Sequence, residues 1–415
     1  MKNVLEYLEQ KNKEQLAIIE EDKNYTYNQL INESKKIGTA LVRYIKPRQP
    51  VAVLMEKGAN TLMAFLGSVY AGGFYCLLNP ELPKIRLEKI LDKLDSNIII
   101  TDEMHIEIAK EICKNKKILE IEELKNEKIN EEKLEEIRKQ ALDVDPLYAN
   151  FTSGSTGTPK GVVVSHRSVI DFINIFTERF KITNKDIIGN QAPFDFDVSV
   201  KDIYPALKTG ATLVIVPKEL FSNPSLLIDF LVDHKVTTMT WAVSALCLIS
   251  TFHGLDYKVP TSVKRVMFSG EVMPMKHLKS WMEHLPNAMF VNLYGPTEIT
   301  CNCTYHIIDR NREYEKIPVG IPFNNEAVFL LNDKNELVTK ESEKGEICVR
   351  GTALALGYYK NKEQTDKAFV RNPLNDKYIE YIYRTGDLGY YQNNELYFGG
   401  RKDFQIKYMG HRIEL

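Results

Sequence analysis

The sequence has few of the features that mark secreted, membrane-spanning or nucleic-acid-binding proteins. Six of its 415 residues are cysteines, and the one close pair, Cys301 and Cys303, is a poor zinc signature. No apolar run is as long as a membrane-spanning helix, and the start, M-K-N-V-L-E-Y-L-E-Q, has no apolar signal-peptide core. The formal net charge of −2 does not suggest a nucleic acid or an anionic membrane as a partner. We therefore expect a cytoplasmic protein with reduced thiols and no membrane insertion.

The composition is that of a folded, globular chain, with 44% hydrophobic and 27% charged residues. Strand-like and helix-like segments alternate over residues 1–185 and again over 186–317. This alternation predicts an α/β fold with two βαβ-type subdomains, whose parallel-rich sheets are covered by helices. Short alternating runs between turn residues over 318–400 predict a small antiparallel, β-barrel-like subdomain.

The period of the apolar residues places the individual elements. In the first subdomain, strands are expected at 51–55, 75–78, 97–101, 147–151 and 162–165, and helices at 61–70, 86–94 and 122–140. In the second subdomain, strands are expected at 187–191, 212–216, 263–268 and 289–293, and helices at 198–207, 226–232 and 276–285.

The most distinctive stretch is T-S-G-S-T-G-T-P-K-G, residues 152–161, between two strand-like runs. Glycine lets the backbone approach an anion, and successive N–H groups can form an anion-binding nest. The pattern favours a nucleotide phosphate loop over a flexible Gly/Ser loop. It is not a Walker A motif, because Gly161 follows Lys160 and a strand-like V-V-V replaces the helix. The candidate phosphate-binding residues are Thr152, Ser153, Gly154, Ser155, Thr156, Gly157 and Lys160.

Two further stretches carry nucleotide-type chemistry. Residues 292–298 read N-L-Y-G-P-T-E, in which Tyr294 offers a flat face and Glu298 offers a hard oxygen ligand suited to Mg²⁺. Residues 383–389 read Y-R-T-G-D-L-G, in which Asp387 suits the paired hydroxyls of a ribose. Simple turns are the alternative in both places, since aspartate is common in turns.

Together these motifs resemble the adenylate-forming superfamily of acyl-CoA synthetases, luciferases and amino-acid adenylation domains. The resemblance covers about residues 25–415. It implies an enzyme that converts a carboxylate and MgATP into an acyl-adenylate and pyrophosphate, and then transfers the acyl group to a thiol. ATP and Mg²⁺ are the implied cofactors.

The resemblance also implies residue roles. Tyr294 would stack on the adenine, Thr297 would meet the α-phosphate, and Glu298 would hold the metal. The implied catalytic residues are Thr152, Lys160, Thr297 and Glu298. Beyond the phosphate loop, the implied ATP contacts are Gly270, Glu271, Asn292, Tyr294, Gly295, Thr297, Asp387 and Arg401.

Residues 401–415 resemble the family's hinge and the start of its small C-terminal domain, with Asp403 at the hinge position. The sequence ends at Leu415, whereas family members continue into that domain. The domain carries a lysine that contacts the carboxylate and the α-phosphate during adenylation. We therefore expect this chain to bind ATP but to turn over poorly.

The acyl substrate is read from F-D-F-D-V-S-V-K-D at residues 194–202. Asp197, beside two aromatic residues, could hold an ammonium group or could cap the following helix. In amino-acid-activating members, an aspartate at this place grips the substrate amine. The implied acyl-pocket residues are Phe196, Asp197, Val198, Lys201, Thr240, Met267, Ser269, Leu293, Cys301 and Asn302.

Within the superfamily, A-P-F-D-F-D-V-S-V-K-D-I-Y-P-A-L is most similar to D-alanine–D-alanyl carrier protein ligases. Ser269 stands where those ligases commonly have cysteine, and Lys201 stands where they have an apolar residue, so another amino acid remains open. Lys201 has two interpretations. It pairs with Asp197 one turn away or extends its ammonium to water, or it projects into the acyl pocket.

We therefore predict a monomeric enzyme that activates an amino acid and loads it onto the phosphopantetheine thiol of a carrier protein. One alternative is a D-alanine–D-alanyl carrier protein ligase of teichoic acid modification. Two more distant alternatives are an acyl-CoA synthetase, which Asp197 disfavours, and a non-catalytic nucleotide sensor. The complete set of Lys160, Thr297, Glu298 and Asp387 disfavours the sensor.

Overall fold

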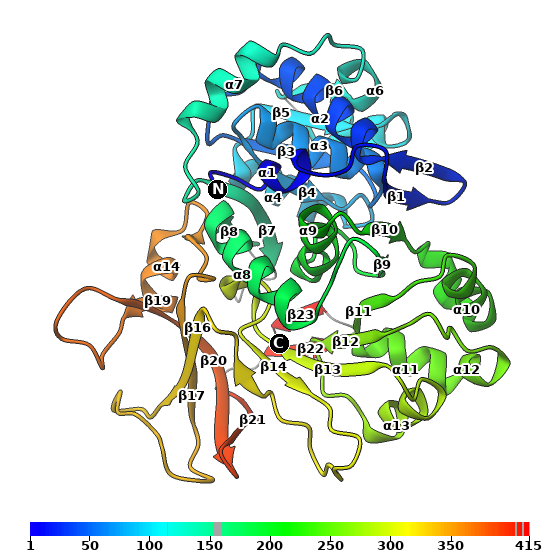
Figure 1. Cartoon of the computed structure of the whole chain (residues 1–415). Coiled ribbons are helices and arrows are strands. Elements are labelled where there is room, and N and C mark those ends of the chain that lie inside the picture. The colour runs from blue at the N-terminus through cyan, green and yellow to red at the C-terminus, as the bar shows by residue number, and fades with distance from the viewer. Residues whose placement is uncertain (114, 153–158, 403–404, 409–410, 415) are drawn as a thin grey trace.

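The computed structural model describes residues 1–113, 115–152, 159–402, 405–408 and 411–414. In this part of the chain, three large sheets and a two-stranded ladder form two α/β lobes with an antiparallel sheet at their side (Figure 1). Among these residues, no helix combines the length and apolar character needed to cross a membrane.

The first lobe, at the top of Figure 1, is built on a seven-stranded sheet in the order β18-β8-β7-β4-β3-β5-β6. Its central strands are parallel, and β7 and β8 form an antiparallel hairpin at one side. Every residue of β3, β4 and β5 is buried, as expected for parallel strands covered on both faces. The bounds are β3 Pro50–Leu54, β4 Phe74–Leu78, β5 Ile98–Thr101, β6 Lys117–Glu120, β7 Pro146–Thr152, β8 Lys160–Ser165 and β18 Gly357–Tyr358.

The second lobe is built on a nine-stranded sheet in the order β15-β14-β13-β12-β11-β9-β10-β1-β2. The strands from β10 to β13 in this order are parallel. The hairpin of β1 and β2 joins from the N-terminus, with β1 parallel to β10. The bounds are β1 Leu16–Glu20, β2 Lys23–Thr26, β9 Ile187–Asn190, β10 Thr212–Ile215, β11 Thr238–Ala242, β12 Arg265–Ser269, β13 Met289–Tyr294, β14 Thr304–Ile307 and β15 Ile321–Pro322.

The two large sheets divide the apolar core of the lobes into three layers, and helices fill each layer. The outer face of the seven-stranded sheet is covered by α4 (Lys84–Leu94) and α5 (Ile106–Ile112). Between the two sheets lie α2 (Tyr27–Leu41), α3 (Ala59–Tyr70), α8 (His166–Arg179) and α9 (Val200–Thr209). The outer face of the nine-stranded sheet is covered by α10 (Pro224–Asp233), α11 (Val243–Thr251), α12 (Gly254–Tyr257) and α13 (Met275–His284). The central layer is continuous, so the lobes share one core.

The remaining helices are short or lie at the periphery. The α-helices are α1 Leu5–Glu9, α6 Ile121–Leu124, α7 Glu131–Gln140 and α14 Lys362–Ala368. The 3-10 turns are η1 Glu103–His105, η2 Asp197–Ser199, η3 Lys218–Ser222 and η4 Thr297–Ile299.

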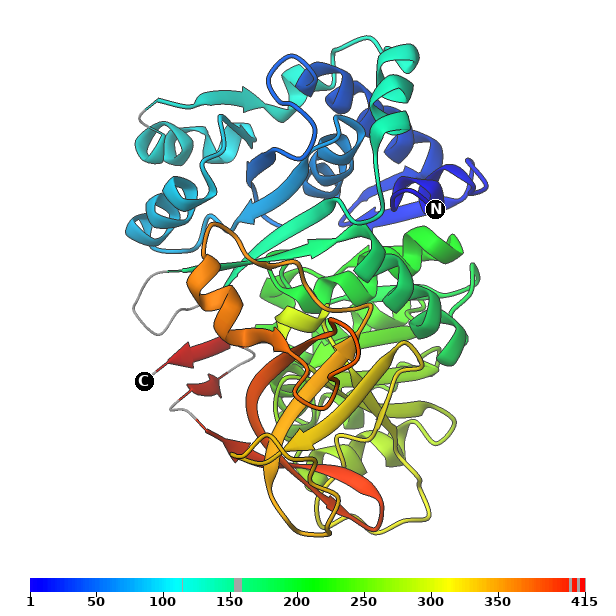
Figure 2. The same cartoon turned by 90° about the vertical axis from the view of Figure 1, so that its left-hand side faces the viewer.

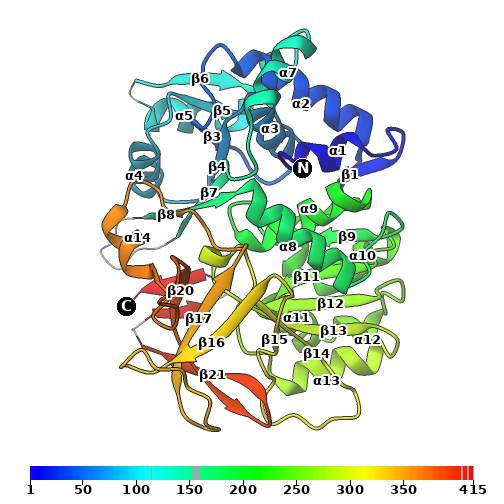
Figure 3. The same ribbon diagram turned by 60° about the vertical axis from the view of Figure 1, so that its left-hand side comes forward.

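An antiparallel sheet curls beside the second lobe (Figures 2 and 3). Its strands are β16 Glu326–Leu331, β17 Gly345–Gly351, β19 Phe369–Arg371, β20 Tyr381–Gln392 and β21 Glu395–Arg401. The register of β20 shifts against both β17 and β21, which bends the strand and increases its twist. The ladder of β22 (Gln405–Tyr408) and β23 (His411–Glu414) follows.

The predicted α/β class, with two parallel-rich sheets and a curled antiparallel sheet, is confirmed. Most expected elements are present with ends shifted by one or two residues. The single helix expected over 122–140 is wrong, because α6 ends at Leu124 and α7 begins separately. The side chain of Asn130 caps α7 by accepting the N–H of Lys133 at 3.0 Å. The strand β11 and the hairpin of β1 and β2 were not among the expected elements.

Candidate active site

The predicted phosphate loop joins two paired strands. Thr152 ends β7 and lies opposite Lys160, which begins β8. Lys160 Nζ lies 6.0 Å from the ring centroid of Tyr358, within reach of a cation–π interaction. The loop residues between the strands, Ser153, Gly154, Ser155, Thr156 and Gly157, lie outside the described residues.

Tyr358 connects the lysine of this hairpin to Glu298. The strand β18 pairs with β8 through Tyr358 and Val162. The Tyr358 hydroxyl donates to Glu298 Oε1 at 2.8 Å, and the Glu298 side chain is buried in η4. Burial, followed by the charge of Glu298, raises the pKa of Tyr358 well above its ordinary value. No motif marks Tyr358 in the sequence, because strand pairing alone brings it to Glu298.

The turn that carries Thr297 and Glu298 has a constrained shape. Thr300 and Cys301 have φ values of 52° and 78°, in the left-handed region that side chains rarely occupy. A Cβ on Gly295 would lie 2.5 Å from the Cα of Asn302, so only glycine allows the chain to fold back there. Backbone strain of this kind is often found at functional sites.

On the far side of this turn, Tyr294 and Arg401 hold Asp387. The Tyr294 hydroxyl donates to Asp387 Oδ2 at 2.6 Å. Arg401, opposite Asp387 in the β20–β21 ladder, forms an ion pair with its other oxygen. The structure thus brings together three predicted nucleotide contacts from two sheets. The predicted hinge residue, Asp403, lies outside the described residues.

The ends of β12 and β13 provide the other predicted nucleotide contacts. Gly270 follows β12 with a φ of +98°, and no described atom lies within 4 Å of the position of a Cβ there. The backbone before Glu271 is therefore open to a flat ligand. Asn292 lies opposite Phe268 in the ladder, and its Nδ2 donates to the Pro318 carbonyl at 2.8 Å.

Asp197 is the first residue of η2, just before α9. The N-cap residues of η2 and α9 are Phe196 and Ser199, and neither N-cap makes a side-chain capping bond. The interpretation of Asp197 as the helix N-cap is therefore wrong. The Cys301 thiol donates to the Asp197 carbonyl at 2.9 Å. This bond ties η2 to the turn that carries Glu298.

One face of the nine-stranded sheet forms the floor of the predicted acyl pocket. Thr240 lies opposite Met267, and Ser269 lies opposite Leu293, all four buried. Across this floor, α9 places Lys201 with 1% of its surface exposed. The interpretation in which Lys201 extends to water is therefore wrong.

The ammonium of Lys201 is held by two polar groups. Lys201 Nζ donates to Asn302 Oδ1 at 2.5 Å and to Ser269 Oγ at 3.3 Å. The structure thus brings together three of the predicted acyl-pocket residues. Val198 lies half-buried in η2, one residue after Asp197.

Three buried tyrosines that no sequence motif marks lie together near Cys301. Tyr75 and Tyr204 share a hydroxyl–hydroxyl hydrogen bond of 2.7 Å. The buried Tyr148 hydroxyl has no hydrogen-bond partner among the described residues. Burial, then the nearby Cys301 and Asp197, raise the pKa of Tyr148 well above its ordinary value. A buried polar atom of this kind suits a bound ligand or water.

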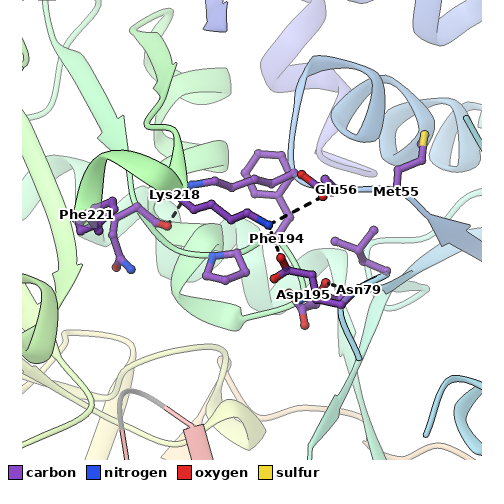
Figure 4. Close-up of a pocket in the computed structure, with 12 residues that line it drawn as sticks. Met55, Glu56, Asn79, Phe194, Asp195, Lys218 and Phe221 are labelled. Carbon is purple, nitrogen blue, oxygen red and sulfur yellow. Dashed lines mark hydrogen bonds and ion pairs between the residues drawn. The ribbon is translucent and has the colours of Figure 1, made fainter. Parts of the chain in front are cut away.

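A cavity of about 300 Å³ opens beside η2, between the two lobes (Figure 4). Burial raises the pKa of its Asp195 carboxyl to about 6. Asp195 directly precedes Phe196, but the described residues that line the cavity include none of the predicted acyl-pocket residues. Lys218 crosses it to form ion pairs with Glu56 and Glu81. Its lining includes Met55, Glu56 and Asn79 from the first lobe and Phe194, Asp195 and Lys218 from the second.

Known proteins show the same sequence pattern and fold. Residues 5–359 match the family model described as AMP-binding enzyme. The chain belongs to this AMP-binding family. It is an AMP-forming adenylation enzyme of the type found in nonribosomal peptide synthetases and D-alanyl carrier ligases. Enzymes of this type activate amino acids as aminoacyl adenylates.

Two curated relatives illustrate the range of this family. A D-alanine–D-alanyl carrier protein ligase of Bacillus cytotoxicus is 31% identical over 97% of the chain and 79% of the relative. Tyrocidine synthase 3 of Brevibacillus parabrevis is also 31% identical over 97% of the chain, which spans 6% of that much longer protein.

Two solved structures share the fold. The Vibrio cholerae adenylation domain AlmE, in complex with glycyl-adenosine-5'-phosphate, is 25% identical with a TM-score of 0.87 over 99% of this chain and 81% of its own. The nonribosomal peptide synthetase FmoA3 (S1046A), in its AMPPNP-bound form, is 25% identical with a TM-score of 0.86 over 97% of this chain and 43% of its own.

Proposed function

We propose that the enzyme activates an amino acid as aminoacyl-AMP, releases pyrophosphate, and loads the aminoacyl group onto the phosphopantetheine thiol of a carrier protein. The observation that carries this proposal is the position of the turn 297–302. Its start holds Thr297 and Glu298, and its end holds Cys301, which binds the backbone of Asp197. Asp197, which is expected to hold the substrate amine, is therefore linked to Thr297 and Glu298, which are expected at the reacting phosphate.

The chemistry needs two transfers. A carboxylate oxygen of the amino acid attacks the α-phosphorus of ATP, and pyrophosphate leaves with the electrons of the broken P–O bond. The thiol sulfur then attacks the carbonyl carbon, its proton passes to solvent, and AMP leaves. Lys160 and Thr297 would stabilise charge on the α-phosphate with a positive charge and a hydroxyl donor. Neither step requires a protein nucleophile.

Glu298 fits the magnesium ion that accompanies ATP. Its carboxylate is buried, and the Tyr358 hydroxyl orients one of its oxygens. Magnesium is usually held by one or two carboxylates together with substrate phosphates. No cluster of three His, Cys, Asp or Glu residues that could hold a metal occurs in the described ranges, so one carboxylate would be the protein's share. When bound, magnesium would neutralise phosphate charge.

Asp197 favours an amino acid over a fatty or aryl acid, because a carboxylate is the natural partner of a substrate ammonium group. Tyr148 adds a buried hydroxyl on the same side. The substrate of an acyl-CoA synthetase has no amine that could bind to these groups. A non-catalytic sensor would not need Lys160 and Glu298 to converge on Tyr358.

A more specific candidate is a D-alanine–D-alanyl carrier protein ligase, which relatives with 31% identity over 97% of the chain support. Lys201 and Ser269 set this chain apart from those ligases at the acyl pocket.

Pyrophosphate exchange over a panel of D- and L-amino acids tests the proposal. Calorimetry with ATP and Mg²⁺ should accompany it. We expect the chain to bind ATP and to exchange pyrophosphate with at least one amino acid of the panel. Failure to bind ATP would overturn the nucleotide assignment. Exchange with fatty or aryl acids alone would favour the acyl-CoA synthetase.

A further inference from the structure

A short connector beside the candidate active site lies outside the helices and strands. It consists of residues 352–356, which join β17 of the antiparallel sheet to β18 of the first lobe. Its backbone holds the turn that carries Glu298. The Ala355 N–H donates to the Glu298 carbonyl at 2.8 Å, and Thr300 Oγ1 donates to the Ala353 carbonyl at 2.7 Å. The position of Glu298 therefore depends on the position of this connector.

Glu326 fixes the start of the connector. It begins β16 opposite Gly351, and its Oε1 accepts the Ala353 N–H at 2.9 Å. A Cβ on Gly351 would lie 2.5 Å from Glu326 Oε2 and 2.3 Å from the Asn325 carbonyl oxygen, so only glycine leaves room for this carboxyl. Ala353 is thus held on both sides, through its N–H by Glu326 and through its carbonyl by Thr300.

The Glu326 carboxyl is an unusual acceptor for a backbone group. Only 8% of the residue is exposed, and Oε2 has no hydrogen-bond partner in the described part of the chain. Burial raises the pKa of the carboxyl to about 8, and the charge of Asp171 adds to this shift. The group is therefore mostly protonated at neutral pH and offers Ala353 an acceptor without a charge. A buried polar atom without a partner destabilises the fold, which indicates a role beyond stability.

We propose that Glu326 is a positioning residue that holds Glu298 in place for the magnesium ion of MgATP. This inference rests on the proposed function, in which Glu298 is the protein's metal ligand. The path runs from Glu326 to Ala353, and from Ala353 to Thr300, which lies two residues after Glu298.

The shape of the turn explains why it needs an anchor from outside. Thr300 is fully buried and has a φ of 52°, in the left-handed region. Residues with side chains keep this conformation only where surrounding contacts enforce it. The bond from Thr300 to Ala353 is such a contact, and Glu326 keeps Ala353 in place to receive it. Because a metal ligand must be held within about 0.5 Å of its working position, a small relaxation of the turn should weaken magnesium binding.

The test measures how much Mg²⁺ tightens the binding of a non-hydrolysable ATP analogue, which requires no turnover. Calorimetry gives the affinity of the analogue with and without Mg²⁺, and the ratio of the two is the magnesium enhancement. Glu326→Met removes the acceptor and keeps the length of the side chain. It should lower the enhancement about two- to tenfold, as expected for one lost hydrogen bond, and leave the affinity without Mg²⁺ unchanged. Glu326→Gln keeps a neutral acceptor and should keep the enhancement.

Two further variants separate positioning from general stability. Thr300→Val removes the next hydroxyl in the path and keeps the branched shape, so its loss and that of Glu326→Met should not add in the double variant. Glu346→Gln changes a similarly buried glutamate of the same sheet, whose carboxyl binds Arg384 and the Gly386 N–H, and it should leave the enhancement unchanged. Thermal melts show whether each variant is folded. Glu326→Asp, which withdraws the carboxyl by one methylene, takes the place of the methionine variant if that one is unfolded.

The outcomes separate this inference from the proposed function. An unchanged enhancement in folded Glu326→Met would overturn the inference and leave the proposed function standing. Equal losses in Glu326→Met and Glu326→Gln, or additive losses in the double variant with Thr300→Val, would also overturn it. A wild-type chain that binds the analogue equally well with and without Mg²⁺ would instead overturn the metal assignment in the proposed function. Failure to bind the analogue at all would overturn the proposed function itself.

Discussion

The two halves of the candidate site are built in opposite ways. The nucleotide half consists of Lys160, Glu298, Tyr294, Tyr358, Asp387 and Arg401, and the acyl half consists of Asp197, Lys201, Ser269 and Asn302. In the nucleotide half, Asp387 and Arg401 are opposite charges in direct contact on adjacent strands. In the acyl half, the buried ammonium of Lys201 donates hydrogen bonds to Ser269 and Asn302.

This difference reflects what each half has to recognise. A triphosphate nucleotide offers the same charges in every reaction, so its site can be organised before the ligand arrives. A variable side chain is distinguished by the shape and the polar groups of the pocket that receives it. We therefore expect substitutions in the nucleotide half to weaken activity with every substrate. Substitutions in the acyl half should change which substrate is used.

The largest effect is expected for Asp197→Asn, which removes the proposed partner of the substrate ammonium. Breaking a buried charge pair costs about 3 to 5 kcal/mol, so kcat/KM for the amino acid should fall by about two to three decades. ATP affinity should stay within a few-fold, which pyrophosphate exchange and calorimetry check together. Equal losses in both measurements would mean that Asp197 acts through the stability of the fold.

Asp387→Asn should weaken the nucleotide half alone. The carboxylate lies between Tyr294 and Arg401, and loss of hydrogen bonds to a charged group costs about 1.5 to 3 kcal/mol, or about 10- to 100-fold in ATP affinity. The order of amino-acid preference should not change. Asp333→Asn is the matched control, because Asp333 pairs with Lys402 at the surface. A changed substrate order in Asp387→Asn would break the separation of the two halves.

Tyr358→Phe should have a smaller effect. It removes the hydroxyl that orients Glu298 but keeps the ring beside Lys160. The loss of a net hydrogen bond of about 0.5 to 1.5 kcal/mol predicts a two- to tenfold fall in exchange rate, with a higher Mg²⁺ concentration at half-maximal rate. Tyr359→Phe is the control from the adjacent position. An unchanged magnesium dependence would contradict the link between Tyr358 and the metal.

The smallest expected effect is a pH dependence confined to the acyl half. Burial raises the pKa of Asp202 to about 7, so its carboxyl is neutral below that pH and ionised above it. Ionisation adds negative charge near Lys201 and Lys57. An aminoacyl-sulfamoyl adenosine analogue with an acidic side chain should therefore bind about two- to fivefold tighter at pH 6 than at pH 8. Burial also lowers the pKa of Lys57 to about 8. Lys57 therefore loses positive charge as the pH rises to 8, which also weakens the binding of an acidic analogue.

Asp202→Asn should flatten most of this dependence, and calorimetry at the two pH values checks it. ATP affinity of the wild-type chain over the same range serves as the reference for the nucleotide half. Tighter binding of the acidic analogue at pH 8 than at pH 6 would contradict the expected direction of the effect.

Much of the fold was predictable, because strand and helix periods are local properties. The parallel strands around β3 to β5 appear as short apolar runs, and their helices appear as amphipathic stretches. The break between α6 and α7 was missed because the whole stretch is rich in Lys and Glu, and a capping asparagine is easily overlooked. The strand β11 was missed because T-T-M-T-W carries little apolar contrast.

The candidate residues of the nucleotide half could be proposed from the sequence, because glycines, hydroxyls and single charges cluster within short motifs there. Tyr358, Tyr148 and Asn190 could not be found in this way. Each acts through a partner on another element, and no local pattern marks it.

The sequence by itself determined the fold class and the presence of Asp197 and Lys201 four residues apart, and it marked a candidate phosphate loop between two strands. Only the tertiary structure decided that Lys201 is buried against Ser269 and Asn302, and that Asp202 is shared with Lys57 through Asn190. The physical reason is that burial and charge pairing depend on elements far apart in the chain. Helix period and turn chemistry depend on neighbours alone.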